Sequence, residues 1–373
     1  MPLPPSPHSI RPAAATLLVL ATLGLAACGG GGESPSPAPT PPAPGPAPIA
    51  ANACAAFPDA NSGAVSGSLA ASASSGAGGA LTWSLVSQPA SGTVSLAAGT
   101  GAYTYTPTSA ARGRLDTFTY KVTDTSGASS QATASVIYGK PRILPLGDSI
   151  TQGVEAFDGT QDLPADAVKI GYRKRLQELL TAGGYPADFV GSQSNGAGAG
   201  IVDASHEGHS GFRTDEIDAG TTAWLAIAKP DIVLLHVGTN DVNQAVNTAT
   251  AVGNVNAILT KASAFAANAT NPPVGLVVAK IVPQRPENGN VPTTTFNASL
   301  TAAYNSQWAD AVNTNARYRV RMVDMFSALD PSTDLTALST DVSGLHPNTS
   351  GYNKMAQVWF DSLVQQGMVA RCP

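Results

Sequence analysis

The hydrophobic pattern of the chain changes its period near Lys140, and this change restricts the possible folds. Before Lys140, apolar side chains recur at every second position in short runs at residues 81–85, 103–105, 118–122 and 132–138. Successive side chains of a strand point to opposite faces, so each run presents one apolar face, and Gly, Ser and Asp mark the turns between the runs. We therefore predict a small all-β sandwich over residues 54–139.

After Lys140 the apolar runs become nearly continuous and alternate with helix-like segments. The apolar runs cover residues 143–146, 189–190, 232–237, 274–282 and 320–325. Two helical faces are formed by Tyr172, Leu176, Leu179 and Leu180 and by Ala356, Phe360, Leu363 and Val364. This alternation is typical of a parallel sheet covered by helices on both faces, so we predict an α/β domain over residues 140–373. In such domains the active site lies beyond the carboxyl ends of the strands.

The amino-terminal residues have the features of an export signal. Arg11 precedes an apolar run at residues 13–27 that is too short to remain as a membrane-spanning helix. The run ends in Leu-Ala-Ala-Cys, which resembles a bacterial lipobox and implies a signal peptide over residues 1–27 and a lipid on Cys28. Ordinary cleavage without a lipid is the alternative. Gly29, rather than Asp, follows Cys28, which by resemblance points to the outer membrane.

Between the signal and the sandwich, residues 28–53 are rich in Gly, Pro, Ser and Ala and predict an extended tether. We expect an exported protein, either an outer-membrane lipoprotein or extracellular. An oxidising compartment favours a disulfide between the remaining cysteines, Cys54 and Cys372, over two free thiols. The 20 Lys and Arg residues against 25 Asp and Glu form no basic cluster, so a nucleic acid partner is not expected.

Four short blocks in the second half carry the residues of a catalytic site. They are GDSITQG at residues 147–153, HEGHSGF at 206–212, GTND at 238–241 and LHPN at 345–348. In this order they resemble the SGNH (GDSL) hydrolase family over about residues 141–370. The resemblance implies a flavodoxin-like three-layer α/β/α domain with a parallel sheet that hydrolyses esters. The segments at residues 101–107 and 116–124 resemble the cadherin-like or Ig-like domains of bacterial surface proteins.

A serine hydroxyl needs a base that takes its proton before it attacks a carbonyl. Of the five histidines, His8 lies in the signal and three belong to other blocks, which leaves His346 as the base for Ser149. The family match assigns the same role to His346. The resemblance further implies that the backbone amides of Ser149 and Gly211 and the side-chain amide of Asn240 bind the oxyanion. No cofactor is expected, and His206 and His209 lack a third strong ligand for a metal.

The position of the acid departs from the family pattern. The family usually places the carboxylate three residues before the histidine, and Ser343 occupies that position here. Asp341, five residues before His346, is the nearest carboxylate. We expect Asp341 to complete a triad, while a Ser–His dyad with Ser343 or a backbone carbonyl as its orienting group is the alternative.

Three segments, at residues 171–176, 188–193 and 206–212, resemble the acetylxylan-esterase branch of the family. This resemblance implies that the substrate is a short-chain, acetyl ester on a polysaccharide such as xylan. A lipase or lysophospholipase is the alternative enzyme, and a catalytically silent surface adhesin is the alternative from another class. No sequence motif identifies the natural ester, the role of the sandwich or the oligomeric state.

Overall fold

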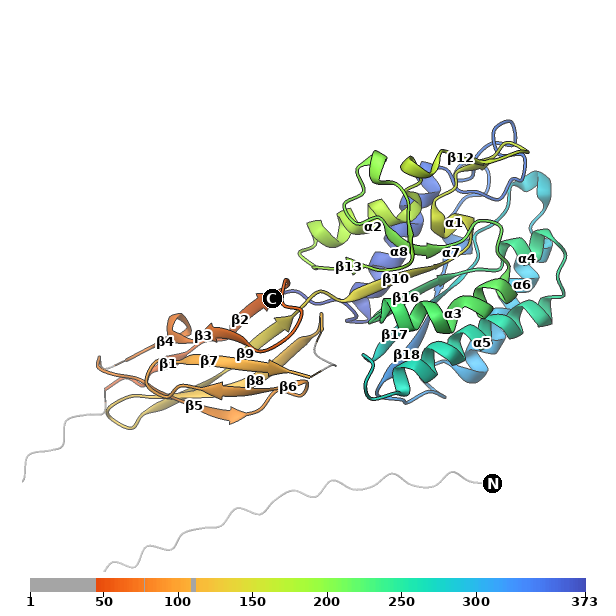
Figure 1. The fold of residues 1–373 in the computed structure, drawn as a ribbon. Helices are drawn as coiled ribbons and strands as arrows, with labels where there is room; N and C mark the ends of the chain where they lie inside the picture. Colours follow the sequence, from red (N-terminus) through yellow and green to blue (C-terminus); the bar gives the residue numbers. More distant parts are fainter. Residues whose placement is uncertain (1–44, 77, 109–111) are drawn as a thin grey trace, which may run out of the picture. The chain divides into compact units, whose positions relative to one another are not determined.

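The computed structural model describes residues 45–76, 78–108 and 112–373 (Figure 1). The predicted signal peptide, Cys28 and the predicted tether up to residue 44 lie outside the described residues. From residue 45 to residue 373 the chain forms one unit of continuous contacts.

An all-β region precedes the α/β domain, as the alternating pattern predicts. One four-stranded sheet has the order β2 (Ala53–Phe57), β9 (Ser129–Tyr138), β8 (Leu115–Thr123) and β5 (Thr82–Ser87). A three-stranded sheet has the order β3 (Val65–Ser68), β7 (Ala102–Pro107) and β6 (Gly92–Leu96). Trp83, Tyr103 and Tyr105 are buried in the shared core, as expected for the inward face of each strand. The Tyr105 hydroxyl donates to Asp116 Oδ2 at 2.9 Å, so its polar end is satisfied inside this core.

Ordered structure begins before residue 54, inside the segment predicted as a tether. Strand β1 (Ile49–Ala50) pairs antiparallel with β4 (Ala73–Ser74), just after a 3₁₀ turn at Ala70–Ser72. The Ala50 amide also donates to Ser130 Oγ at 3.4 Å. These contacts use backbone groups, which a composition of Ala and Pro does not reveal, so the sequence placed the start of the sandwich too late.

The α/β domain contains a seven-stranded, mostly parallel sheet. Its main path runs β14 (Gln193–Ser194), β15 (Ser205–Gly208), β10 (Arg142–Gly147), β16 (Ile232–His236), β17 (Val274–Lys280) and β18 (Tyr318–Asp324). Strand β13 (Asp188–Phe189) also pairs with β10, and only β14 is antiparallel to its neighbour. The first strand of the α/β domain, β10, therefore lies inside the sheet with parallel neighbours on both sides, the arrangement of a flavodoxin-like fold.

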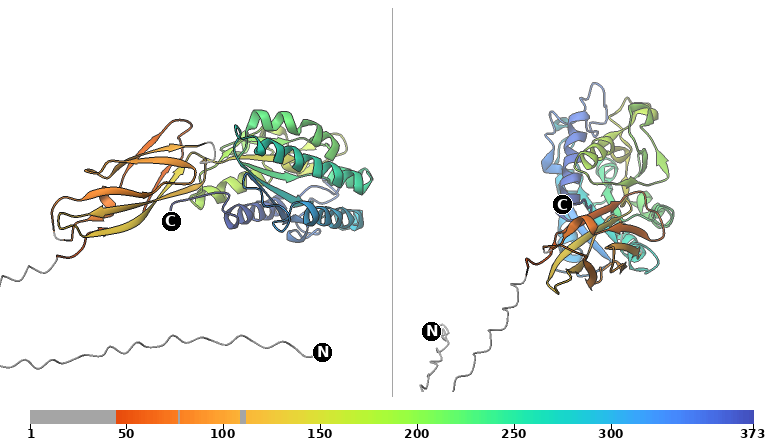
Figure 2. Two further views of the ribbon diagram at one scale, coloured as in Figure 1. Left: turned by 90° about the horizontal axis from the view of Figure 1, so that it is seen from below. Right: turned by 90° about the vertical axis from the view of Figure 1, so that its left-hand side faces the viewer.

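Helices cover both faces of this sheet, and Figure 2 shows the layers from two further directions. On one face α2 (Gly171–Ala182) and α8 (Thr349–Gln365) pack together through Tyr172 and Trp359. On the other face lie α3 (Thr214–Ala228), α5 (Thr248–Ala267) and α6 (Val291–Gln307). The predicted stripe on α2 is buried at Tyr172, Leu176 and Leu180, since positions four apart share one face of a helix.

Short elements connect these layers. They are α1 (Ser149–Gln152), α4 (Thr239–Asn243), α7 (Met325–Ala328), β11 (Ala156–Phe157), β12 (Asp162–Leu163) and 3₁₀ turns at Asp166–Val168, Ala197–Ala199 and Pro286–Asn288. Within the described part of the chain, every helix is too short or too polar to cross a bilayer.

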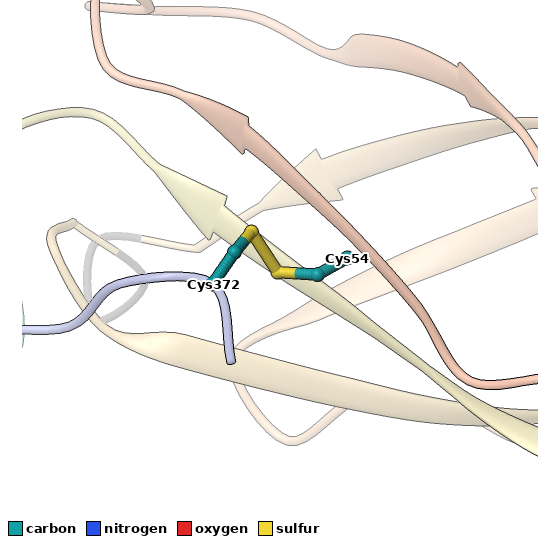
Figure 3. Close-up of a disulfide and its surroundings, with 2 residues drawn as sticks. All are labelled: Cys54 and Cys372. Carbon is teal, nitrogen blue, oxygen red and sulfur yellow. A yellow bond between two sulfur atoms is a disulfide. The ribbon is translucent and has the colours of Figure 1, made fainter. Parts of the chain in front are cut away.

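A disulfide connects the first long strand of the sandwich with the end of the chain (Figure 3). Cys54 on β2 and Cys372 after α8 have their sulfur atoms 2.06 Å apart and their Cα atoms 5.6 Å apart. The pairing encloses a sequence separation of 318 residues, so it fixes the carboxyl terminus of the α/β domain to the sandwich.

Candidate active site

Ser149 stands at the carboxyl end of the central strand β10, where the chain turns into α1. The Asp148 side chain caps this helix, because its Oδ1 accepts a hydrogen bond from the Ile150 amide at 3.0 Å. Gly147 is required at the strand end, since a Cβ there would lie 2.1 Å from the carbonyl oxygen of His236 on β16. Ser149 is 7% exposed, so its hydroxyl lies just below the surface.

The structure brings His346 and Asp341 to Ser149. Ser149 Oγ lies 3.0 Å from His346 Nε2, and His346 Nδ1 lies 3.2 Å from Asp341 Oδ2. All three side chains are at least nine-tenths buried. The three groups thus form a continuous hydrogen-bonded series, which is the arrangement in which a base activates a hydroxyl and a carboxylate orients that base.

Asp341 reaches the ring because the backbone wraps around its carboxylate. Its Oδ2 accepts the amides of Leu345 and His346, each at 3.0 Å, and its Oδ1 accepts the amide of Phe157 at 2.9 Å. Gly344 has a φ of +66°, which permits the tight turn before Leu345. The five-residue spacing to His346 is therefore closed by a turn.

Ser343 bridges the acid and the base. Its hydroxyl donates to Asp341 Oδ1 at 2.6 Å and lies 3.3 Å from His346 Nδ1. Burial by itself would raise the pKa of Asp341, but the hydrogen bond and charge of His346, together with the Ser343 hydroxyl, hold the pKa of that carboxyl well below its usual value. Asp341 is therefore ionised at neutral pH and can stabilise a positive charge on His346.

The second block forms a loop beside Ser149. The His209 amide donates to the Gly147 carbonyl at 2.9 Å, which holds the loop against the end of β10. Gly211 follows with a φ of +79°, a conformation that favours glycine. Throughout the residues that the structure describes, neither the Gly211 amide nor the Ser149 amide donates a hydrogen bond to a protein acceptor.

Asn240 lies in the first turn of α4, at the carboxyl end of β16. One of its side-chain N–H groups donates to the carbonyl of Phe212 at 2.9 Å, and this bond connects Asn240 to the Gly211 loop. The next residue, Asp241, accepts both the amide and the hydroxyl of Thr214 at the start of α3, at 2.9 and 2.7 Å. Asp241 therefore holds the start of α3 against α4.

An aromatic stack supports the same loop, and sequence reasoning missed it. The His209 ring lies between Phe212 at 4.8 Å and Trp224 at 4.6 Å, nearly parallel to both. Its Nε2 is 2.7 Å from Glu207 Oε1, and Glu207 is in turn buried against Ser192. Glu207 and His209 are two positions apart along an extended segment, which places them on one face; this spacing was the signal available in the sequence.

The two histidines of the second block therefore have different hydrogen-bond partners. Whereas His209 pairs with Glu207, His206 is fully buried, with Nε2 2.9 Å from Asn195 Oδ1 and Nδ1 accepting the Gly208 amide at 3.0 Å. Burial lowers the pKa of His206 to about 2, so its ring is neutral. In residues 45–373, apart from the four that are not described, no three His, Cys, Asp or Glu side chains are grouped as metal ligands would be.

Comparison with known proteins places these blocks in a family. A model of the GDSL-like Lipase/Acylhydrolase family matches residues 146–354, which is more than half of the chain. A model of the bacterial Ig domain matches residues 46–137.

Individual relatives are similar over about three fifths of the chain. A "Multidomain esterase" of Ruminococcus flavefaciens is 28% identical over an alignment of 281 residues, and the alignment covers 64% of this chain. The match spans only 32% of that relative's length. Among solved structures, a family 3 carbohydrate esterase of Clostridium thermocellum is 29% identical with a TM-score of 0.47, covering 61% of this chain and 97% of that one. An acetyl esterase mutant crystallised with an acetate ion is 26% identical with the same TM-score, covering 61% and 98%.

The family model covers the carboxyl end of β10, Ser149 at the start of α1, the Gly211 loop, Asn240 and the turn that joins Asp341 to His346. The chain therefore belongs to the GDSL-like Lipase/Acylhydrolase family.

Proposed function

We propose that this protein is a serine esterase in which Ser149 is the nucleophile, His346 the general base and Asp341 the orienting acid. The observation that carries the proposal is the series Ser149 Oγ, His346 Nε2, His346 Nδ1 and Asp341 Oδ2, with separations of 3.0 and 3.2 Å. The match to an esterase of Ruminococcus flavefaciens supports the same reaction class.

The reaction proceeds through an acyl-enzyme. Ser149 Oγ attacks the ester carbonyl carbon while its proton passes to His346 Nε2. The tetrahedral intermediate collapses, the bond to the alcohol oxygen breaks, and His346 returns the proton to that oxygen. Water then attacks the acyl-Ser149 carbonyl with His346 again as base, which releases the carboxylic acid and restores the serine. Asp341 stays ionised throughout and holds the imidazolium in the productive orientation.

The amides of Ser149 and Gly211 and the side chain of Asn240 are proposed to bind the oxyanion. Both backbone amides lack a protein acceptor among the described residues, and Asn240 keeps one of its two N–H groups after donating to Phe212. An oxyanion that accepts three preorganised donors is stabilised far more than in water, because the donors need not reorient during the reaction. Loss of one such donor typically costs about 3 kcal/mol of transition-state stabilisation.

The proposed substrate is an O-acetyl or other short-chain ester on a polysaccharide such as xylan. This substrate class rests on the segments at residues 171–176, 188–193 and 206–212, which resemble the acetylxylan-esterase branch. One of these segments contacts the helix that begins at Ser149. Arg173 donates to the carbonyls of Thr151 and Gln152, at 3.1 and 2.9 Å, and these residues follow Ser149 by two and three positions. Arg173 is fully buried, so it positions the loops of the site and leaves the ester itself to other residues.

The protein is further proposed to act outside the cytoplasm, as an outer-membrane lipoprotein attached through Cys28 or as an extracellular enzyme. The bacterial Ig domain and the disulfide between Cys54 and Cys372 support export, since disulfides persist in oxidising compartments. Acyl chains on one cysteine would give a durable attachment, because two or more chains bind membranes far more strongly than one.

The proposal is tested by initial rates on p-nitrophenyl acetate, butyrate and octanoate and by acetate release from acetylated xylan. Wild type should prefer acetate and release acetate from the polymer, and Ser149→Ala should lose at least about 10³-fold in kcat. Ser306→Ala, an exposed serine on α6 whose hydroxyl bonds only its own helix, is the matched control and should keep full activity. A preference for octanoate would favour the lipase alternative, and an inactive wild type would favour the silent adhesin.

A further inference from the structure

A small cavity lies at the amino-terminal ends of the parallel strands, whereas Ser149 lies beyond their carboxyl ends. Ile232 begins β16, Val274 begins β17 and Tyr318 begins β18, so the cavity is at the amino-terminal ends of these strands. Its volume is about 230 Å³. This is smaller than the usual pocket for a drug-sized ligand and fits an ion or one charged group of a larger molecule.

Arginine dominates the lining of this cavity, which we call the arginine pocket. Its five arginines come from the sandwich and from the region around β18: Arg112, Arg114, Arg317, Arg319 and Arg321. Asp231 is the only carboxylate of the lining. Guanidinium groups present parallel N–H donors that match the two oxygens of a carboxylate or phosphate, so their accumulation in one cavity indicates anion recognition.

Three of the five arginines already have partners within the described residues. Arg112 Nε lies 3.8 Å from Asp231, and Arg321 pairs with Asp310 at 2.5 Å. Arg317 donates to carbonyl groups that include Ala266 and Asn271, at 2.8 and 2.6 Å, so its charge is held in place but not neutralised.

Arg114 and Arg319 provide the free charge. Both side chains are exposed, and neither has a hydrogen bond or an ion pair with any residue that the structure describes. Arg114 is attracted by Asp231, which already pairs with Arg112, and is repelled by Arg319. Five arginines face the two carboxylates of Asp231 and Asp310, which leaves three positive charges unbalanced at one site. An anion between Arg114 and Arg319 would relieve this repulsion.

We propose that the arginine pocket binds an oxyanion, either the carboxylate of a uronic acid unit in a polysaccharide or a phosphate group. The proposal does not depend on the esterase mechanism, because none of Ser149, His346 and Asp341 lines the pocket. The ligand would contact the sandwich through Arg114 and the α/β domain through Arg319, and would therefore hold the two regions together. The segment that follows α8 also lines the pocket and continues to Cys372.

The test is calorimetric titration of the full-length protein with inorganic phosphate and, separately, with glucuronate, against chloride at equal ionic strength. Wild type should bind at least one of the two oxyanions, and Arg114→Gln/Arg319→Gln should weaken that binding about tenfold or more, since charge-assisted hydrogen bonds are lost. Arg114→Lys/Arg319→Lys should bind with intermediate affinity, because the charge remains and the paired donors do not. Tighter binding of glucuronate identifies a polysaccharide carboxylate, and tighter binding of phosphate identifies a phosphate group.

Lys121→Gln/Lys261→Gln is the control. It also removes two positive charges, at sites outside the arginine pocket, and should bind as wild type does. All variants should keep the wild-type kcat on p-nitrophenyl acetate and an unchanged circular dichroism spectrum, which separates this site from the esterase site and excludes misfolding. The proposal is overturned if wild type binds neither oxyanion, or if the double glutamine variant binds as tightly as wild type.

Discussion

Among single residues, Asp341 shows how a carboxylate can serve a histidine from an unusual distance along the chain. The turn at Gly344 brings Asp341 Oδ2 to 3.2 Å from His346 Nδ1, and Ser343, at the usual position of the acid, bonds to both. The sequence left the choice between a triad and a dyad open, since the Phe157 amide that holds Asp341 lies 184 residues away. Steady-state kinetics of variants at Asp341 and Ser343 therefore test the proposed role of Asp341.

Replacement of Asp341 by Asn should lower kcat on p-nitrophenyl acetate by about 10²- to 10⁴-fold with little change in KM. The neutral amide lacks the negative charge that stabilises the imidazolium, and its N–H₂ group can donate to Nδ1 and so favour the wrong tautomer of His346. Ser343→Ala, which keeps the carboxylate, should lose about tenfold or less. Near-normal turnover of Asp341→Asn, with a large loss in Ser343→Ala, would instead make Ser343 the orienting group of a dyad.

Asp148 gives a prediction for stability against pH. Burial raises the pKa of Asp148 to about 7, although the Ile150 amide and His346 oppose the rise, and its Oδ2 has no partner among the described residues. A folded-state pKa above the unfolded value of about 3.9 means that the folded state binds more protons between these values. The stabilisation from this residue is thus complete below about pH 4 and is lost as the pH rises through 7.

Asp148→Asn should remove this dependence while keeping the cap of α1, because Asn caps helices as well as Asp does. The free energy of unfolding of the variant relative to wild type, measured with urea, should increase from pH 5 to pH 8 by at most about 2.5 kcal/mol. A difference that stays constant over this range would show that the Asp148 carboxyl is already ionised at pH 5.

At the scale of elements, the site depends on the close approach of β15 to α1. Gly208 at the end of β15 has no room for a side chain, since its Cβ would lie 2.4 Å from the Gln152 amide nitrogen. Gly147 of β10 is paired with Gly208 on one side and with His236 on the other. Ser149 and the Gly211 loop are therefore placed side by side by two strands that end in glycine.

Gly208→Ala should displace α1 and lower both stability and activity. Overpacking of this kind costs about 1–3 kcal/mol, and the misplaced Ser149 should lose about tenfold or more in kcat. Gly253→Ala is the control, because a Cβ on this exposed position of α5 meets open space and should stabilise the helix by about 0.5–1 kcal/mol. Urea unfolding and initial rates measure both effects, and a Gly208→Ala enzyme with wild-type values would contradict the account.

The elements with strong periodicity could be predicted from the sequence. The alternating runs became β5, β7, β8 and β9, and the continuous runs became β10, β16, β17 and β18. Strand β1 could not be predicted, since two residues that pair through their backbones carry no side-chain pattern. The stack of His209 between Phe212 and Trp224 was also missed, because Trp224 comes from α3 and meets the loop only in the fold.

For the whole molecule, the disulfide between Cys54 and Cys372 is the strongest covalent restraint on how the chain is arranged. Their pairing was favoured by the compartment and by elimination, while the boundary between the domains at residues 139 and 140 remains a prediction from the change of periodicity. The arginine pocket was beyond sequence analysis, since Arg112, Asp231 and Arg319 are brought together only by the fold.

Cys54→Ser/Cys372→Ser should lower the midpoint of thermal unfolding while leaving the ester hydrolysis rate at 25 °C close to wild type. The chain-entropy model for a loop of 318 residues gives about 6 kcal/mol as the upper limit of the loss. Wild type treated with reductant should match the variant, and further reductant should not change the variant. An unchanged unfolding midpoint would mean that the bridge contributes nothing to stability.

Covalent labelling with a fluorophosphonate, followed by peptide mass analysis, tests the central claim most directly. An activated serine beside a base attacks phosphorus, so wild type should carry one adduct, located on Ser149. The adduct should be absent in Ser149→Ala and should form at least about 10²-fold more slowly in His346→Ala, where the base is lost. An unlabelled wild type, or a label on another residue, would contradict the assignment of Ser149 as the nucleophile.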